Sequence, residues 1–213
     1  YKALIKYDTK MSVCGLQRFS NVNEIIPFEP DEISIRCETT KSVLEHVFYQ
    51  DQQDIYSIAA CGKLYKKELF INIQFPLGRL NEDMAVITDL MMNCRNIAVV
   101  SKPIYYYRIN TNSITMKKFS SQRMDAIIFS FKIISDLNNF YPDIVNSAKV
   151  LLFSRSCELL TIARYTSLSN EFKAEKKVLT KARVQARCAA LISFFNISLV
   201  TLILKNVRRI RYK

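Results

Sequence analysis

Hydrophobic residues follow two different spacings in the first part of the chain. Apolar and polar positions alternate over residues 11–16, which predicts a strand because successive strand side chains point to opposite faces. Apolar residues then recur at helical spacing between residues 43 and 48, which predicts a helix that Thr40 caps and that ends near Tyr49. The turn-rich residues 21–30 are expected to form a loop or an irregular hairpin.

Strands and helices are predicted to alternate further along the chain. Residues 57–61 are predicted to form a strand that leads into a short helix within residues 63–70. Two more strands are predicted at residues 97–101 and 104–108. This alternation indicates an α/β fold.

From Gln122 onward the apolar pattern is helical. A second helix is predicted after the start signal at residues 141–143, Tyr-Pro-Asp, and Ser169 or Asn170 is expected to cap a last, basic helix. We therefore expect an α/β part that ends at about residue 119 and packs against a helical part.

The net charge of +12 is concentrated near the end of the chain. Residues 1–120 hold 15 Lys/Arg and 13 Asp/Glu, whereas residues 171–213 hold 11 and 2. This segregation indicates that the C-terminal part meets a negatively charged surface. A nucleic-acid-binding module is one alternative, but the basic residues flank an apolar segment and no nucleic-acid-binding motif occurs, so no nucleic acid partner is expected.

The apolar segment is the run of 17 uncharged positions from Cys188 to Leu204. A membrane-spanning helix needs about 17 to 25 apolar residues, so this run is at the short limit. Three interpretations stay open: a helix in the headgroup layer of an anionic leaflet, a helix buried in the fold or in an oligomer, and a true span. The first implies a cytoplasmic protein held peripherally on the inner face of the cell membrane through residues 173–213.

Cysteine and histidine usage excludes several classes of site. The six cysteines include no C-x-x-C pair, which fits neither a zinc site nor a small disulfide framework and suits a reducing cytosol. The single histidine, His46, is expected to be a partly buried helix residue, which leaves no histidine for a Ser-His-Asp or Cys-His hydrolase. With three glycines, the chain also lacks a G-x-G-x-x-G or Walker-type phosphate loop.

Two adjacent acids follow a loop that contains proline and glycine. In residues 75–83, Phe-Pro-Leu-Gly-Arg-Leu-Asn-Glu-Asp, Asn81 is expected to cap a helix whose first turn carries Glu82 and Asp83. The positive end of the helix dipole favours ionised carboxylates there, so one of them could act as a base. The alternative is that both acids are ordinary first-turn residues.

Four segments resemble the family 2 glycosyltransferases in order and spacing. They are Ala60–Phe70, with Gly-Lys-Leu-Tyr at its centre, the Phe-Pro-x-Gly of residues 75–78, the Asn-Glu-Asp of residues 81–83, and Tyr-Tyr-Tyr-Arg at residues 105–108 with Ser113 five residues later. The resemblance covers roughly residues 1–120. It implies the acceptor-side sheet and helices of an A-type glycosyltransferase fold, followed by a helical C-terminal extension, and inverting transfer from a nucleotide-sugar donor to a polysaccharide, teichoic acid or lipid-linked acceptor.

The resemblance also implies roles for five residues. Asp83 matches the base that deprotonates the acceptor hydroxyl, and Glu82 lies beside it. Arg108 and Ser113 match groups that contact the leaving diphosphate. Lys63 either faces the acceptor or lies in a solvated turn, and the tyrosines before Arg108 are expected mainly in the core, with sugar stacking as the alternative.

One feature of the family is missing. Family members bind the nucleotide and its Mg²⁺ or Mn²⁺ through an N-terminal half with an Asp-x-Asp motif, and this chain has none, because Asp51 and Asp54 have the wrong spacing. The first residue, Tyr1, is expected to lie inside a longer protein that supplies the cation ligands. The isolated chain is expected to have little or no turnover.

These observations predict three parts: an acceptor-side domain at residues 1–119, a helical extension at residues 120–185, and a basic apolar tail at residues 186–213. The alternative to an enzyme is a non-catalytic interaction module that binds a membrane surface or nucleic acid. The oligomeric state does not follow from the sequence.

Overall fold

The computed structural model describes residues 1–27, 29, 32–49, 55–110, 121–152 and 155. The chain forms two compact units. The first comprises Tyr1–Phe75 and Val86–Met116, and the second comprises Pro76–Ala85 and Lys117–Lys213.

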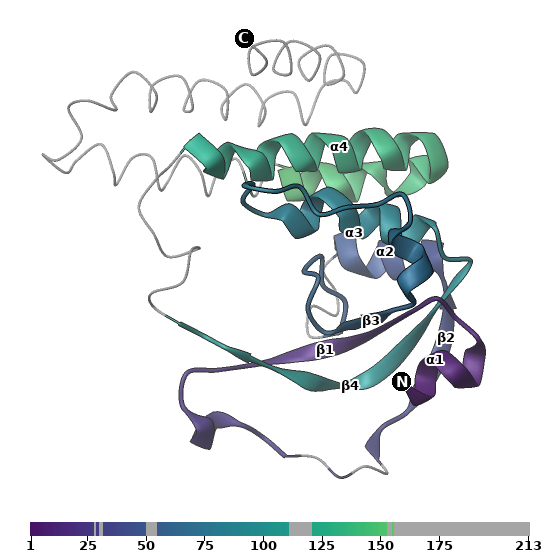
Figure 1. The fold of residues 1–213 in the computed structure, drawn as a ribbon, viewed down its shortest axis with the longest axis vertical. Coiled ribbons are helices and arrows are strands. Elements are labelled where there is room, and N and C mark those ends of the chain that lie inside the picture. Colours follow the sequence, from purple (N-terminus) through teal and green to yellow (C-terminus); the bar gives the residue numbers. More distant parts are fainter. Residues whose placement is uncertain (28, 30–31, 50–54, 111–120, 153–154, 156–213) are drawn as a thin grey trace, which may run out of the picture. The chain divides into compact units, whose positions relative to one another are not determined.

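A four-stranded mixed sheet is the centre of the first unit (Figure 1). Its strands are β1 (Met11–Phe19), β2 (Ile35–Thr39), β3 (Lys63–Tyr65) and β4 (Asn96–Arg108), in the order β2-β4-β1-β3. Strands β1 and β4 run parallel, and the two outer strands pair antiparallel to them. The inner half of β4, Ile97–Val100, is buried throughout, as expected for a central strand covered on both faces. The predicted α/β class is confirmed.

Strand β4 corrects the prediction of two separate strands. It runs without interruption, but its register against β1 shifts: Cys14 pairs with Val100, and Leu16 pairs with Tyr105. Pro103 lies in the shifted stretch, and proline has no N–H to donate to a neighbouring strand. The irregular pairing therefore accommodates the proline inside one strand.

In the first unit, helix α1 (Lys2–Tyr7) precedes strand β1 along the chain, and helix α2 (Thr40–Tyr49) follows strand β2. Helix α1 was not predicted, whereas α2 has the predicted bounds. The predicted capping residue is wrong by one position, because the hydroxyl of Thr39 accepts the hydrogen bond from the Ser42 N–H at 3.2 Å. Thr40 is buried, and its hydroxyl donates to the carbonyl oxygen of Cys94.

The predicted strand at residues 57–61 does not form. The chain is irregular there, and β3 begins only at Lys63, followed by the 3₁₀ helix η3 (Lys67–Phe70). Gly62, just before β3, has a φ of +69°, which is favourable mainly for glycine and does not occur in a regular strand. The strand therefore begins only after this residue. A Cβ at this position would lie 2.8 Å from Leu16 Cδ2 and 3.0 Å from the Cys14 carbonyl oxygen.

From Ser121 onward, the described part of the second unit is helical, as predicted. It contains η5 (Ser121–Met124), α4 (Asp125–Phe140) and η6 (Pro142–Ile144), with helical backbone continuing to Leu152. Pro142 begins η6, which agrees with the predicted start signal. Helix α3 (Glu82–Met92) contributes its first turn to this unit and its later residues to the first unit.

The predicted tail and the cap at Ser169 or Asn170 lie outside the described residues. Among the helices that the structure does describe, none combines the length and hydropathy needed to cross a membrane. The three predicted parts and the membrane contact of residues 173–213 stay predictions.

Candidate functional site

Glu82 and Asp83 form the first turn of α3, as predicted. Glu82 is exposed and Asp83 is half-buried. The Met84 N–H donates to the Asn81 carbonyl oxygen at 3.0 Å and to Asp83 Oδ1 at 2.9 Å. Both side chains therefore lie at the N-terminal end of α3, where the N–H groups of the first turn point toward them.

The backbone before α3 turns sharply into the helix. Gly78 has a φ of +68° and Asn81 a φ of +56°, so two residues within four positions are left-handed. Asparagine tolerates this conformation better than most other residues because its short polar side chain can form local hydrogen bonds. Residues 78–81 therefore form a sharp turn that sets the direction of the first turn of α3, which carries Glu82 and Asp83.

This turn is held by an ion pair between the fully buried Asp125 carboxylate and the partly buried Arg79 guanidinium. Asp125, the first residue of α4, has 0% of its surface exposed. Its carboxylate accepts a hydrogen bond from Arg79 Nε at 2.9 Å, contacts Arg79 Nη2 at 2.8 Å and accepts another hydrogen bond from the Leu80 N–H at 3.1 Å. The pairing with Arg79 is bidentate, which is the most directional form of a carboxylate–guanidinium contact.

Two more contacts reach this segment, one from α4 and one from η5. The Arg79 guanidinium carbon lies 5.3 Å from the centre of the Phe129 ring, within the range of a cation–π interaction. Phe129 is four residues after Asp125, so the two side chains share one face of α4. Just before α4, Gln122 Nε2 donates to the Gly78 carbonyl oxygen at 3.1 Å.

Lys63 begins β3, opposite Val13 of β1. Its ammonium group donates to the carbonyl oxygens of Ala59 at 2.5 Å and Cys61 at 3.4 Å. The side chain therefore stabilises the turn before its own strand, and its contact with the acceptor stays a prediction.

Arg108 is the last residue of β4 and is exposed. It pairs with Phe19, at the end of β1, while Lys63 pairs with Val13 near the start of the same strand. Phe19 lies six positions after Val13 on β1, a distance of about 20 Å at the usual rise per residue. Lys63 and Arg108 are therefore not neighbours within the first unit.

The other predicted residues divide between the units. Glu82 and Asp83 belong to the second unit, and Lys63 and Arg108 to the first. Ser113 lies outside the described residues.

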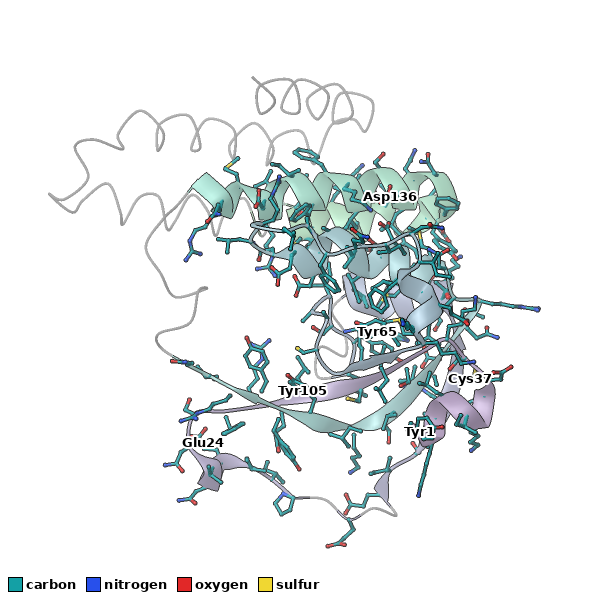
Figure 2. The ribbon with its side chains drawn as sticks, viewed as in Figure 1. Tyr1, Glu24, Cys37, Tyr65, Tyr105 and Asp136 are labelled. Carbon is teal, nitrogen blue, oxygen red and sulfur yellow. The ribbon has the colours of Figure 1, made fainter. Side chains whose placement is uncertain are left out.

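The tyrosines before Arg108 correct another expectation. Tyr105, Tyr106 and Tyr107 are 42%, 45% and 40% exposed, so they do not form the predicted core. Figure 2 shows Tyr105 on the ribbon formed by β1 and β4. Strands β2 and β3 pair only with the other ends of these two strands, so within the described residues no third strand pairs with the two-stranded part of β1 and β4 that carries the tyrosines. Arg18 lies over the ring of Tyr107 at 5.8 Å.

The histidine prediction is confirmed. His46 lies in α2 with its side chain 29% exposed, and its ring stacks on Tyr56 at a centroid distance of 4.5 Å. Tyr56 donates to Glu38 Oε1 at 2.5 Å and accepts from Arg36 Nη2 at 2.7 Å. Burial and the hydrogen bond to Glu38 raise the pKa of Tyr56 to about 12.

The divalent cation implied by the sequence resemblance has no matching ligand set in the described residues. In that part of the chain, no three His, Cys, Asp or Glu side chains come together in a group that could hold a metal ion.

Sequence reasoning missed Arg79 and Asp125 as parts of the site. Arg79 stands inside the Pro/Gly loop, where a cation beside two acids was a usable signal. Asp125 is 46 residues further along, and no sequence pattern links it to the loop. Only the tertiary structure identifies it as the partner of the turn.

Comparison with known proteins shows a distant relationship to a glycosyltransferase. The chain is 25% identical over 147 residues to the Glycosyltransferase GlyA of Streptococcus pneumoniae serotype 4 (strain ATCC BAA-334 / TIGR4). The matched region is 67% of this chain and 21% of that protein, so the chain spans about a fifth of its relative's length. No protein-family model matches the chain. The similarity, together with the mixed α/β sheet, supports a glycosyltransferase in general terms.

Proposed function

We propose that this chain supplies the acceptor side of a family 2 inverting glycosyltransferase. The observation that carries the proposal is the acidic pair Glu82–Asp83 on the first turn of α3, set behind a turn that a buried ion pair fixes. The distant similarity to a glycosyltransferase supports the same class of reaction. The donor is a nucleotide sugar, and the acceptor is a polysaccharide or a lipid-linked glycan.

Asp83 is the proposed base. Its carboxylate takes the proton of an acceptor hydroxyl while that oxygen forms a bond to the anomeric carbon of the donor sugar. The bond from the anomeric carbon to the diphosphate breaks on the opposite face, and the diphosphate leaves with the electron pair. Asp83 is only half-buried, which leaves it accessible to a hydroxyl group.

The negative charge that develops on the leaving diphosphate is stabilised by cations and hydrogen-bond donors. The exposed guanidinium of Arg108 is a planar cation suited to phosphate oxygens, and the Ser113 hydroxyl is proposed as a second donor. Glu82 and Lys63 are proposed to shape the acceptor end. Of these two assignments, the one for Lys63 is less favoured by the structure because its ammonium group already binds two carbonyl oxygens.

The 213-residue chain is proposed to bind the nucleotide sugar poorly by itself. The sequence has no Asp-x-Asp motif, and the described residues provide no metal-binding cluster. Isothermal titration of the 213-residue chain with UDP-glucose and Mn²⁺ is expected to give no measurable heat. Micromolar binding of the nucleotide sugar would contradict this proposal.

The acceptor is proposed to lie at the inner membrane surface. Its support is the excess of 11 Lys/Arg over 2 Asp/Glu in residues 171–213, which favours an anionic leaflet. Co-sedimentation with phosphatidylglycerol vesicles should exceed co-sedimentation with a DNA duplex at two salt concentrations. Stronger binding to DNA would favour the alternative of a nucleic-acid-binding module.

Sugar transfer itself is tested with the protein that carries this chain. It is incubated with membranes of the source cells and radiolabelled UDP-glucose, UDP-galactose or UDP-N-acetylglucosamine. Label is expected to move from one of these donors into the glycan or lipid fraction. Label that stays in the nucleotide sugar for every donor would contradict the proposal.

A further inference from the structure

We infer that Arg79 and Asp125 are positioning residues for the acidic pair, an inference that rests on the proposed function of Asp83. The buried ion pair ties the turn of residues 78–81 to the start of α4. It thereby sets the direction in which the first turn of α3 presents Asp83.

The contacts on Asp125 show how the tie works. Its carboxylate binds both the side chain of Arg79 and the backbone N–H of Leu80, which fixes two consecutive residues at once. Asn81 follows directly, with its left-handed φ of +56°, and Glu82 begins the helix. Only Asn81 and Glu82 separate Leu80 from Asp83, so a change in the Leu80 backbone is transmitted over a short, sharply turned segment.

The chemistry of the pair favours orientation over stability. Burying the Asp125 carboxylate has a desolvation cost even with Arg79 beside it, and apolar side chains of similar volume often stabilise a protein equally well. What apolar side chains cannot supply is a bidentate, directional contact that also accepts a backbone N–H. The Phe129 ring beside the guanidinium further restricts the position of Arg79.

The first arm of the test does not depend on transfer activity. Amide hydrogen exchange of residues 78–84 is compared between wild type, Asp125→Asn, Arg79→Lys and Asp136→Asn. Asp136 is a matched control on the same helix (Figure 2), where it forms a partly exposed ion pair with Lys132 at 2.6 Å. Loss of a hydrogen bond to a charged group is expected to speed exchange at Leu80 about tenfold or more in Asp125→Asn. Exchange equal to that of wild type would overturn the inference.

The second arm measures sugar transfer in the protein that carries this chain. In Asp125→Asn and Arg79→Met, kcat is expected to fall at least about tenfold while the KM for the donor changes little, because the misplaced group is the base. Arg79→Lys should recover part of the lost kcat, and Asp136→Asn should match wild type. Faster exchange with unchanged kcat would overturn the positioning role.

The two arms separate this inference from the function on which it rests. If Asp83→Asn keeps full transfer activity while Asp125→Asn accelerates exchange, the proposed function fails although the tie between the turn and α4 is real. If Asp83→Asn abolishes transfer while Asp125→Asn changes neither exchange nor kcat, the function stands and this inference fails.

Discussion

The carboxylate of Asp125 and the guanidinium of Arg79 meet in a bidentate ion pair, with contacts of 2.9 and 2.8 Å, across 46 residues of sequence. Asp125 is fully buried, whereas the Arg79 side chain is 30% exposed. The carboxylate therefore depends on this pairing more than the guanidinium does.

This asymmetry predicts which partner is more costly to remove. Arg79→Met removes the bidentate guanidinium contact from a fully buried carboxylate, which keeps its hydrogen bond from the Leu80 N–H, and is expected to lower the free energy of unfolding by about 3–5 kcal/mol. Asp125→Leu should cost less, because Arg79 can turn toward water. The double variant should recover part of the loss. Urea denaturation measures all three, and equal losses in the two single variants would contradict the asymmetry.

Two glycines with nearly the same φ should respond differently to alanine. Both Gly62→Ala and Gly78→Ala place a Cβ on a left-handed residue, at a cost of about 1–2 kcal/mol. At Gly78 the new methyl group meets nothing within 4 Å, but at Gly62 it meets Leu16 Cδ2 at 2.8 Å and a backbone oxygen at 3.0 Å. Gly62→Ala is therefore expected to cost about 1–3 kcal/mol more. Gly62→Ala should therefore have the lower thermal unfolding midpoint. Equal midpoints for the two variants, or a lower midpoint for Gly78→Ala, would contradict this prediction and show that the contact at Gly62 relaxes freely.

The raised pKa of Tyr56 predicts that the free energy of unfolding falls at alkaline pH. Its pKa is raised to about 12 by burial and by its hydrogen bond to Glu38, against about 10 in the unfolded chain. The stabilisation is fully present below pH 10 and is lost as the pH rises toward 12, because the unfolded state then releases the proton first. Urea unfolding midpoints of wild type should therefore fall more between pH 9 and 11.5 than those of Tyr56→Phe.

Tyr105→Phe serves as the control for this prediction, since Tyr105 is 42% exposed. It should follow the alkaline decline of wild type. A decline of equal size in Tyr56→Phe would mean that Tyr56 does not contribute to it.

Glu38 predicts the opposite dependence in acid. Burial raises its pKa, but hydrogen bonds from Tyr56, Arg36 and Ser42 more than compensate, so the net pKa is below the ordinary value. Its stabilisation is thus present above the unfolded pKa of about 4.3 and is lost as the pH falls through the lower folded value. Glu38→Gln should flatten the decline in unfolding midpoint between pH 5 and 3. An unchanged decline would assign the acid sensitivity to other carboxylates.

The spacing of apolar residues over short stretches of sequence correctly predicted several individual helices and strands. The alternation at residues 11–16 and the helical spacing after Thr40 correspond to β1 and α2, and the acids at residues 82–83 do begin α3. The join of two predicted strands into β4 depends on pairing with β1, which sits some eighty residues earlier and is invisible to a local window.

The remaining errors have the same origin. Alternation predicted that some of Tyr105–Tyr107 would be buried, but burial requires neighbours, and the flanking strands β2 and β3 pair with other parts of β1 and β4. Likewise, the sequence indicated the acidic pair but not Asp125, because an ion pair between distant segments leaves no periodic signal. The roles of Asp83, Glu82, Lys63, Arg108 and Ser113 stay predictions.

The central claim is that Asp83 removes the proton from the acceptor hydroxyl. Its most direct test is the rate of sugar transfer by the Asp83→Asn variant of the protein that carries this chain. Asp89→Asn, later in the same helix, is the matched control. Loss of a general base is expected to lower kcat about 10²- to 10⁴-fold, with wild-type folding by circular dichroism and near-wild-type transfer in the control. Transfer by Asp83→Asn at the wild-type rate would contradict the account.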